Sequence, residues 1–322
     1  MLIPGESRRS RWCIVVADDH GPEWAPYDSL ELGSAPVQYC RLGDSSTLLH
    51  RSLRRAASIA PTSQILVTAL EEYRERWEPM SWVVRPEMRF VCGHRAASLL
   101  TTAAAILSIA KTSPSSIVTI LPARCYVAHE SILIRALKHV ASELAAVPEG
   151  AATLGMLDLD EGVDEDYLVV GRAPAGGPGL AIQGMARRPT GWVARHLRRQ
   201  GGVVASGIMI GHAGVFAAHI SKQWPGISLK LTKLIAAASA AQVECEIPDS
   251  LLRGVPGAVV KSLRWNPAAF PQRVFTVCQS GWSGLKSPQE VARIAEFHSS
   301  RIGRDRIRAE HATAESIGSV IS

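Results

Sequence analysis

The sequence predicts an α/β fold in which a mostly parallel, mixed sheet is flanked by helices. Short runs rich in β-branched and apolar residues alternate with longer segments whose apolar residues recur at helical spacing. A chain of 322 residues is long enough to bury a large core. Hydrophobic residues make up 47% and charged residues 20% of the chain, which is typical of a globular protein and excludes wholesale disorder.

The alternation can be followed along the chain. Strands are expected at residues 12–17, 64–68, 81–84, 116–121, 152–157, 167–170, 203–210 and 273–278. Helices are expected at residues 47–59, 95–111, 130–144, 191–200 and 226–241, and a long surface loop at 172–184. Strands that alternate with helices indicate a parallel sheet covered by helices. Because ligands bind such sheets beyond the carboxyl ends of the strands, the loops after Ala17 and Leu121 are where chemistry is expected.

No segment predicts a membrane span or a secretory signal. The longest weakly polar stretch, residues 96–110, is too short to cross a bilayer and contains serines and threonines. The N-terminus places apolar residues before its arginines, the reverse of a secretory signal, so we expect a cytoplasmic protein. Six cysteines without a CxxC pair predict reduced thiols rather than a zinc site or a disulfide framework.

The formal net charge of +6 is concentrated in four arginine-rich runs, at residues 8–11, 51–55, 195–199 and 301–308. Such runs can favour acidic partners. Because they fall on predicted helices or near the termini without interleaved aromatic residues, solvated helix faces are the simpler interpretation. A nucleic-acid partner is therefore not expected, and anionic small molecules or membrane lipids remain as alternatives.

Several short strings, in their order and spacing, resemble the bacterial mannose-1-phosphate guanylyltransferases, a branch of the sugar-nucleotide pyrophosphorylases. WCIVVA at 12–17 resembles the family's opening strand, PVQY at 36–39 its PKQY string, and IVTILPARCY at 117–126 the strand that ends in PSDH or PADH. ARRP at 186–189, ASG at 205–207 and GWSG at 281–284 stand where EKP, WNSG and GWSD are expected. The resemblance implies a GT-A-like, Rossmann-like nucleotidyltransferase domain over residues 12–298, with a flexible N-terminus at 1–11 and a basic C-terminal tail at 299–322.

The phosphate-binding loop of the family is altered in this chain. Its glycines let backbone N–H groups approach the phosphates, because a side chain there would block them. Here Asp18 and Asp19 would face a polyphosphate, and Pro22 offers no N–H. The phosphate-facing lysine of the family's PKQ string falls on Val37. The loop is therefore expected to be an altered or blocked pocket.

The metal positions implied by the resemblance are replaced as well. The two aspartates that would hold magnesium fall on Arg124 and Gly284. Magnesium prefers oxygen ligands, which an arginine cannot supply. No cofactor is therefore expected, and Mg²⁺ belongs only to an alternative in which the enzyme is active. Arg124 could instead place a fixed positive charge near the vacated metal site.

Some polar groups of a vestigial pocket persist. Arg95 lies near the family's NRGT position, and Arg188 replaces the lysine of EKP, so two cations could still hold a phosphate or a sugar phosphate. The expected ligand-binding residues are Asp18, Asp19, Arg95, Arg124, Arg188 and Ser206. No catalytic residue and no metal ligand is assigned to this pocket.

The sequence therefore predicts a degenerate nucleotidyltransferase-like protein, a pseudoenzyme that acts as a binding or regulatory partner in sugar-nucleotide or polysaccharide metabolism. A sugar phosphate, a nucleotide or another protein is the expected partner. The alternative is an active nucleotidyltransferase that makes GDP-mannose from GTP and mannose 1-phosphate, with Asp18 and Asp19 as ligands of a rearranged metal site.

Overall fold

The computed structural model describes residues 10–18, 36–42, 46–93, 98–147, 150–157, 165–173, 178–251, 273–285 and 290–294. The expected flexible N-terminus lies outside these residues except for positions 10 and 11, and the basic tail lies outside them entirely. Asp19 and Arg95, two of the expected site residues, also lie outside them.

Ten described strands form one sheet in the order β10-β3-β2-β1-β4-β9-β6-β11-β8-β7. They are β1 (Arg11–Val16), β2 (Ile65–Leu70), β3 (Arg89–Cys92), β4 (Ile117–Pro122), β6 (Ala151–Met156), β7 (Tyr167–Val170), β8 (Leu180–Ala186), β9 (Val203–His212), β10 (Cys245–Ile247) and β11 (Arg273–Val277). Two short strands, β5 (Tyr126–Val127) and β12 (Trp282–Ser283), pair with each other beside it.

The prediction of a mixed sheet is confirmed, but only half of it is parallel. All neighbours from β10 to β4 run parallel. In the other half β9 runs antiparallel to β4, β6 and β7, and β8 is antiparallel to β7 and β11. Only β6 and β11 are parallel there. The expectation of a mostly parallel sheet therefore holds for the half that contains β1 and β4.

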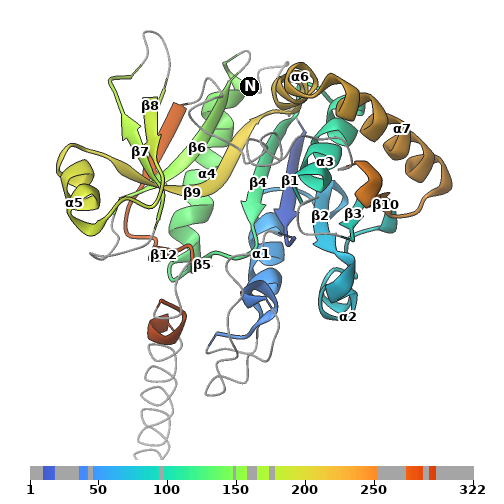
Figure 1. Cartoon of the computed structure of the whole chain (residues 1–322), viewed down its shortest axis with the longest axis horizontal. Helices are drawn as coiled ribbons and strands as arrows, with labels where there is room; N and C mark the ends of the chain where they lie inside the picture. Colours follow the sequence, from blue (N-terminus) through green and yellow to red (C-terminus); the bar gives the residue numbers. More distant parts are fainter. Residues whose placement is uncertain are drawn as a thin grey trace, which may run out of the picture.

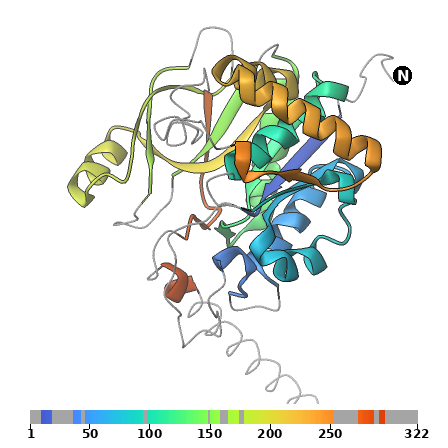
Figure 2. The same cartoon turned by 45° about the vertical axis from the view of Figure 1, so that its right-hand side comes forward.

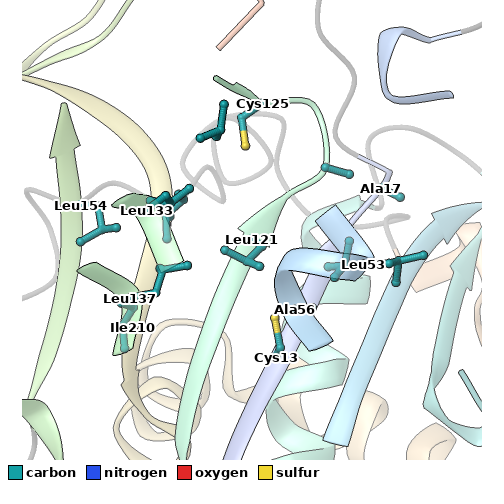
Figure 3. Close-up of a cluster of buried hydrophobic side chains, with 14 of the residues drawn as sticks. Cys13, Ala17, Leu53, Ala56, Leu121, Cys125, Leu133, Leu137, Leu154 and Ile210 are labelled. Atoms are coloured by element: carbon teal, nitrogen blue, oxygen red, sulfur yellow. The ribbon is translucent and has the colours of Figure 1, made fainter. Parts of the chain in front are cut away.

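Helices cover both faces of the sheet (Figure 1). On one face α1 (Leu48–Ala57) and α4 (Glu130–Ala145) bury leucines, alanines and a valine. Figure 3 shows Leu53 of α1 and Leu133 of α4 on this face, with the strand residues Leu121 and Ile210. On the other face lie α3 (Ser98–Thr112), α6 (Ala213–Gln223) and α7 (Pro225–Ala241), seen together in Figure 2.

Strand alternation assigns residues to these two faces. Cys13, Val15 and Ala17 belong to the α1 and α4 side, whereas Ile14 belongs to the α3 side. By the same alternation Asp18 is directed toward α3. This placement decides what the Asp18 carboxylate can contact.

Local signals explain the helix ends. The hydroxyl of Thr47 accepts a hydrogen bond from the His50 N–H at 3.2 Å and so caps α1. Pro225 occupies the first turn of α7, where its missing N–H costs nothing, and Gln242 ends that helix in the left-handed region with φ of 56°.

Two segments differ from the sequence prediction. Residues 81–84 form a turn rather than a strand, because Trp82 and Val83 are 77% and 41% exposed and bury no strand face. The expected loop at 172–184 is partly wrong, since β8 begins at Leu180. Its residues are only half-buried, so the glycines and prolines before it conceal the strand signal.

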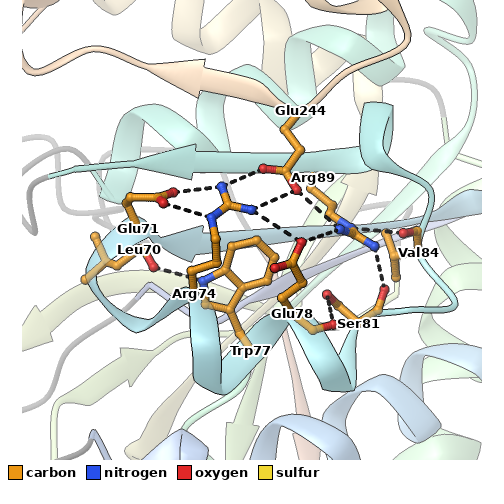
Figure 4. A network of polar contacts seen from close by, with 9 residues as sticks. All are labelled: Leu70, Glu71, Arg74, Trp77, Glu78, Ser81, Val84, Arg89 and Glu244. Carbon is orange, nitrogen blue, oxygen red and sulfur yellow. Dashed lines mark hydrogen bonds and ion pairs between the residues drawn. The ribbon is translucent and has the colours of Figure 1, made fainter.

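An ion-pair network ties the short helix α2 (Arg74–Trp77) to the edge of the sheet (Figure 4). Arg74 Nη2 lies 2.7 Å from Glu71 Oε2 and 2.7 Å from Glu244 Oε2. Glu244 is the residue immediately before β10. Arg89 Nη1 on β3 lies 3.2 Å from Glu244 Oε1. Glu78 contacts both arginines at 3.5 Å. The network thus fastens β10 and α2 to β3.

Because of this network, a small part of the free energy of unfolding should depend on pH in the acidic range. The hydrogen bond from Arg74 holds the pKa of Glu71 below its ordinary value of 4.5. A lowered carboxyl pKa gives stability that is present above the unfolded value and is lost as pH falls through the folded value. Because the Glu71 side chain is 51% exposed, we expect only about 0.5 kcal/mol. Urea unfolding of Glu71→Gln should show a shallower acid slope than the wild type. Glu75, which lies on α2, is exposed as well, and Glu75→Gln should match the wild type.

Candidate functional site

The carboxyl ends of β1 and β4 bring two of the expected site residues close together. Val16 pairs with Pro122 in the parallel register, and the Ala123 N–H donates to the Val16 carbonyl at 2.8 Å. Asp18 and Arg124 each follow this last pair by two residues. Their backbones therefore lie on neighbouring segments, at the edge of the sheet where a ligand crevice is expected.

A short 3₁₀ helix, η2 (Val37–Tyr39), closes onto the same edge. The Gln38 side-chain amide and the Tyr39 hydroxyl both donate to the Ala17 carbonyl at 2.9 Å. Burial, and next the Asp18 carboxylate, raise the pKa of the Tyr39 phenol above its ordinary value, so Tyr39 is a neutral donor. Val37 is buried and brings no charge to this edge.

The pair of β12 with β5 adds the fourth segment. Trp282 pairs with Val127 and Ser283 with Tyr126, so Gly284 lies beside the loop that carries Arg124. The segments that contain positions 18, 37, 124 and 284 thus gather at one edge, as the family resemblance implied. The part of these residues in ligand binding stays a prediction.

Asp18 contributes to packing between elements. Its side chain is fully buried. The hydroxyl of Thr68 on β2 donates to one carboxylate oxygen at 2.8 Å, and that of Thr101 on α3 donates to the other. The carboxylate therefore links β1, β2 and α3 on the face that strand alternation assigned to it, and two hydroxyls already satisfy part of its hydrogen-bonding capacity.

A buried carboxylate that the sequence analysis missed lies against Gly284. Glu165 is fully buried just before β7. A Cβ atom placed on Gly284 would lie 2.1 Å from Glu165 Oε1 and 3.0 Å from the Trp282 ring. The carboxylate beside position 284 therefore comes from residue 165, and a side chain at 284 would need Glu165 to move. No local pattern in the sequence indicates this contact, because the two residues are far apart along the chain.

Arginines of α1 support the loop that carries Arg124. Arg55 makes two hydrogen bonds of 2.8 Å to the Glu130 carboxylate, and its Nη1 lies 3.4 Å from Cys125 Sγ. Burial disfavours the charged form of Arg55, but contacts with Cys125 and Glu130 outweigh it and raise the pKa above its ordinary value. Arg51 Nη2 donates to the Val127 carbonyl at 2.9 Å. Two arginines of α1, Arg51 and Arg55, thus contact the segment that follows Arg124.

Two more expected site residues are described. Ser206 donates to the Leu154 carbonyl at 2.7 Å and accepts from the Ile208 N–H at 3.1 Å, so its hydroxyl stabilises the irregular part of β9. This arrangement favours a structural role for Ser206. Arg188 is exposed after β8, and its backbone N–H donates to Asp166 Oδ1 at 3.1 Å.

A groove lies elsewhere, away from the carboxyl ends of β1 and β4. It has a volume of about 340 Å³ and is lined by α4, β8 and β11, with His139 as its titratable group. None of the expected site residues lines it.

Across the described ranges no group of three or more His, Cys, Asp or Glu side chains could hold a metal ion. In the same part of the chain, no helix combines the length and the apolar character that crossing a membrane requires.

Comparison with known proteins shows which fold this is. Neither a family model nor a curated protein matches the sequence. Solved structures do. A mannose-1-phosphate geranyltransferase from Thermus thermophilus superposes with a TM-score of 0.63 at 20% identity, over 88% of this chain and 79% of that one. A mannose-6-phosphate isomerase from Helicobacter pylori gives 0.60 at 14% identity, over 85% and 99% of the two chains.

A third similar structure is a UDP-glucose pyrophosphorylase from Acinetobacter baumannii, with a TM-score of 0.51 at 13% identity over 94% of this chain and 99% of that one. The chain shares the fold of these proteins. Their names describe a transferase, an isomerase and a pyrophosphorylase, so the fold by itself does not select a reaction. The reaction has to be argued from the side chains at the crevice.

Proposed function

We propose that this protein is a degenerate nucleotidyltransferase-like protein, similar to mannose-1-phosphate guanylyltransferases, that has lost catalysis. In this proposal it acts as a binding or regulatory partner in sugar-nucleotide or polysaccharide metabolism. Its GT-A-like fold is retained, and the vestigial pocket binds a sugar phosphate or a nucleotide. The sugar phosphates and the nucleotide sugar in the names of the similar structures support this class of ligand.

The contact between Glu165 and Gly284 carries the proposal. The resemblance expects a metal-binding aspartate at position 284, and the side chain of Glu165 fills the space that this aspartate would need. At the second metal position Arg124 supplies no oxygen ligand, and Val37 supplies no cation for phosphate. Loss of one preorganised electrostatic group commonly costs about 10² to 10³ in rate, and several are lost here together.

One observation favours the alternative that the chain is an active enzyme. Glu165 provides a carboxylate beside position 284, so an oxygen ligand is present although it comes from another segment. Together with Asp18 and Asp19 it could form a rearranged magnesium site. Against this, two threonine hydroxyls already bind Asp18, which is fully buried. We therefore keep loss of catalysis as the proposal.

The test is synthesis of GDP-mannose from GTP and mannose 1-phosphate with magnesium. We expect no product above the uncatalysed background, because the phosphate loop, the lysine and both metal ligands are missing together. Product and pyrophosphate are measured by chromatography. Robust turnover that disappears in both Asp19→Ala and Glu165→Gln would instead establish the active enzyme with a rearranged site.

Calorimetric titration with mannose 1-phosphate tests the binding half of the proposal. If arginines replace the metal, binding should be equally strong with EDTA and with magnesium, and weaker in Arg188→Ala. Arg187→Ala is the matched control, since Arg187 is the neighbouring arginine and is equally classed as exposed. Binding that needs magnesium would contradict a metal-free pocket.

A further inference from the structure

The helix α5 (Gly191–Arg199) presents a face that no described element covers. Trp192, Arg195, His196 and Arg199 are all exposed, and their spacing places them on one side of the helix. We call these four residues the basic face of α5. Trp192 is 70% exposed, which is unusual for so large an apolar ring.

The opposite side of α5 fixes the helix to the sheet. Ala194 is buried in the core, and Leu197 packs against the same cluster. Arg198 Nε donates to the Tyr167 hydroxyl on β7 at 3.0 Å. Because these contacts fix the rotation of α5 about its axis, the basic face points away from the sheet.

The charged residues of α5 and the residue Arg187 before it are all basic. α5 contains no acidic residue, and exposed Arg187 precedes it. None of Arg187, Arg195 and Arg199 forms an ion pair within the described ranges. Figures 1 and 2 both show α5 at one extremity, projecting away from the sheet. The helix therefore lies at the periphery of the described structure.

We propose that the basic face of α5 binds the surface of an anionic lipid bilayer. An indole ring is favoured at the headgroup level of a membrane, where its apolar body and its N–H are both accommodated. Guanidinium groups pair with lipid phosphates. Proteins that bind single-stranded nucleic acid stack successive bases on several aromatic rings, and this face offers one. The proposal is independent of the pocket described above.

Binding should be weak, reversible and sensitive to salt. Each basic residue near an anionic surface contributes about fivefold in affinity, and this attraction is screened by ions. One aromatic ring and the two arginines of this face resemble a single membrane signal, which gives marginal anchoring. The protein should therefore bind vesicles only when they contain anionic lipid and should leave them at high salt.

Flotation with two kinds of vesicle tests the proposal. We expect the full chain to float with vesicles of phosphatidylcholine and phosphatidylglycerol in equal parts and not with phosphatidylcholine alone. Arg195→Gln/Arg199→Gln should weaken binding about 25-fold, the product of about fivefold for each arginine. Trp192→Ala should weaken it as well. These residues are exposed, so the variants should fold normally.

Matched controls separate this face from general charge and hydrophobicity. Trp82→Ala removes another exposed tryptophan, at 77%, and Lys230→Gln/Lys233→Gln removes two exposed charges from α7. Both controls should bind as the wild type does. The proposal is overturned if no vesicle binding occurs, if the controls lose binding equally, or if a single-stranded DNA oligonucleotide is bound while vesicles are not.

Discussion

Glu130→Ala should destabilise the protein by about 3 kcal/mol, although it removes a side chain that is 30% exposed. The reason is the partner that remains. The side chain of Arg55 is only 1% exposed, and Glu130 accepts two hydrogen bonds of 2.8 Å from it. Without Glu130 a guanidinium stays buried with its charge uncompensated. Urea unfolding followed by circular dichroism measures the loss.

The two residues differ in burial, since the Arg55 side chain is 1% exposed and that of Glu130 is 30% exposed. Glu143→Ala removes a partly buried glutamate from the same helix, for which the described part of the chain gives no ion pair, and should change stability by less than about 0.5 kcal/mol. Arg55→Met/Glu130→Leu removes both charges and should recover most of the loss, since an apolar pair can replace a buried ion pair. If Glu130→Ala alone leaves the stability unchanged, the buried charge of Arg55 does not need Glu130. The loop that carries Arg124 is then held by other contacts.

Periodicity was sufficient to predict three elements of the candidate site, β1, β4 and α1. β1 and β4 were expected because their apolar runs are continuous, and both are buried on the two faces as such runs predict. α1 was expected from helical spacing, with its start at Thr47. The rule that ligands bind at the carboxyl ends of strands indicated the loops after Ala17 and Leu121, whereas the gathering of positions 18, 37, 124 and 284 was implied by the family resemblance.

Other features depend on contacts that no local pattern contains. The direction of β9 is not encoded in its apolar run, so the antiparallel half of the sheet was missed. Residues 81–84 have the composition of a strand, but exposed Trp82 and Val83 show that composition alone misassigned them. The role of Ser206 in holding β9 depends on the Leu154 carbonyl, which is distant in sequence.

Glu165 is the clearest case of a residue that sequence reasoning could not find. It lies two residues before β7 and carries no motif. Its importance comes only from its contact with Gly284. The glycine at 284 and the burial of a carboxylate at 165 are thus two aspects of one local arrangement.

Gly284→Asp, the substitution that would restore the carboxylate implied by the resemblance, should destabilise the protein by about 3 kcal/mol or more. The new Cβ would lie 2.1 Å from Glu165 Oε1, and Glu165 is fully buried, so it cannot withdraw into solvent without repacking. The new carboxylate would also stand against an existing one, and like charges in a buried site repel strongly. Urea unfolding measures the effect, and Gly284→Ala separates overpacking from charge because it adds the Cβ alone.

The double variant Gly284→Asp/Glu165→Ala decides whether Glu165 is the cause. Removing the Glu165 side chain frees the space beside 284, so Gly284→Asp should cost far less in this background than in the wild type. Such non-additivity is expected only for residues in direct contact. Gly207→Ala, at a glycine with φ of 75° beside Pro122, is a matched control whose cost should be the same in both backgrounds. If Gly284→Asp alone is tolerated, a carboxylate fits at 284 beside Glu165, and the observation on which loss of catalysis rests is removed.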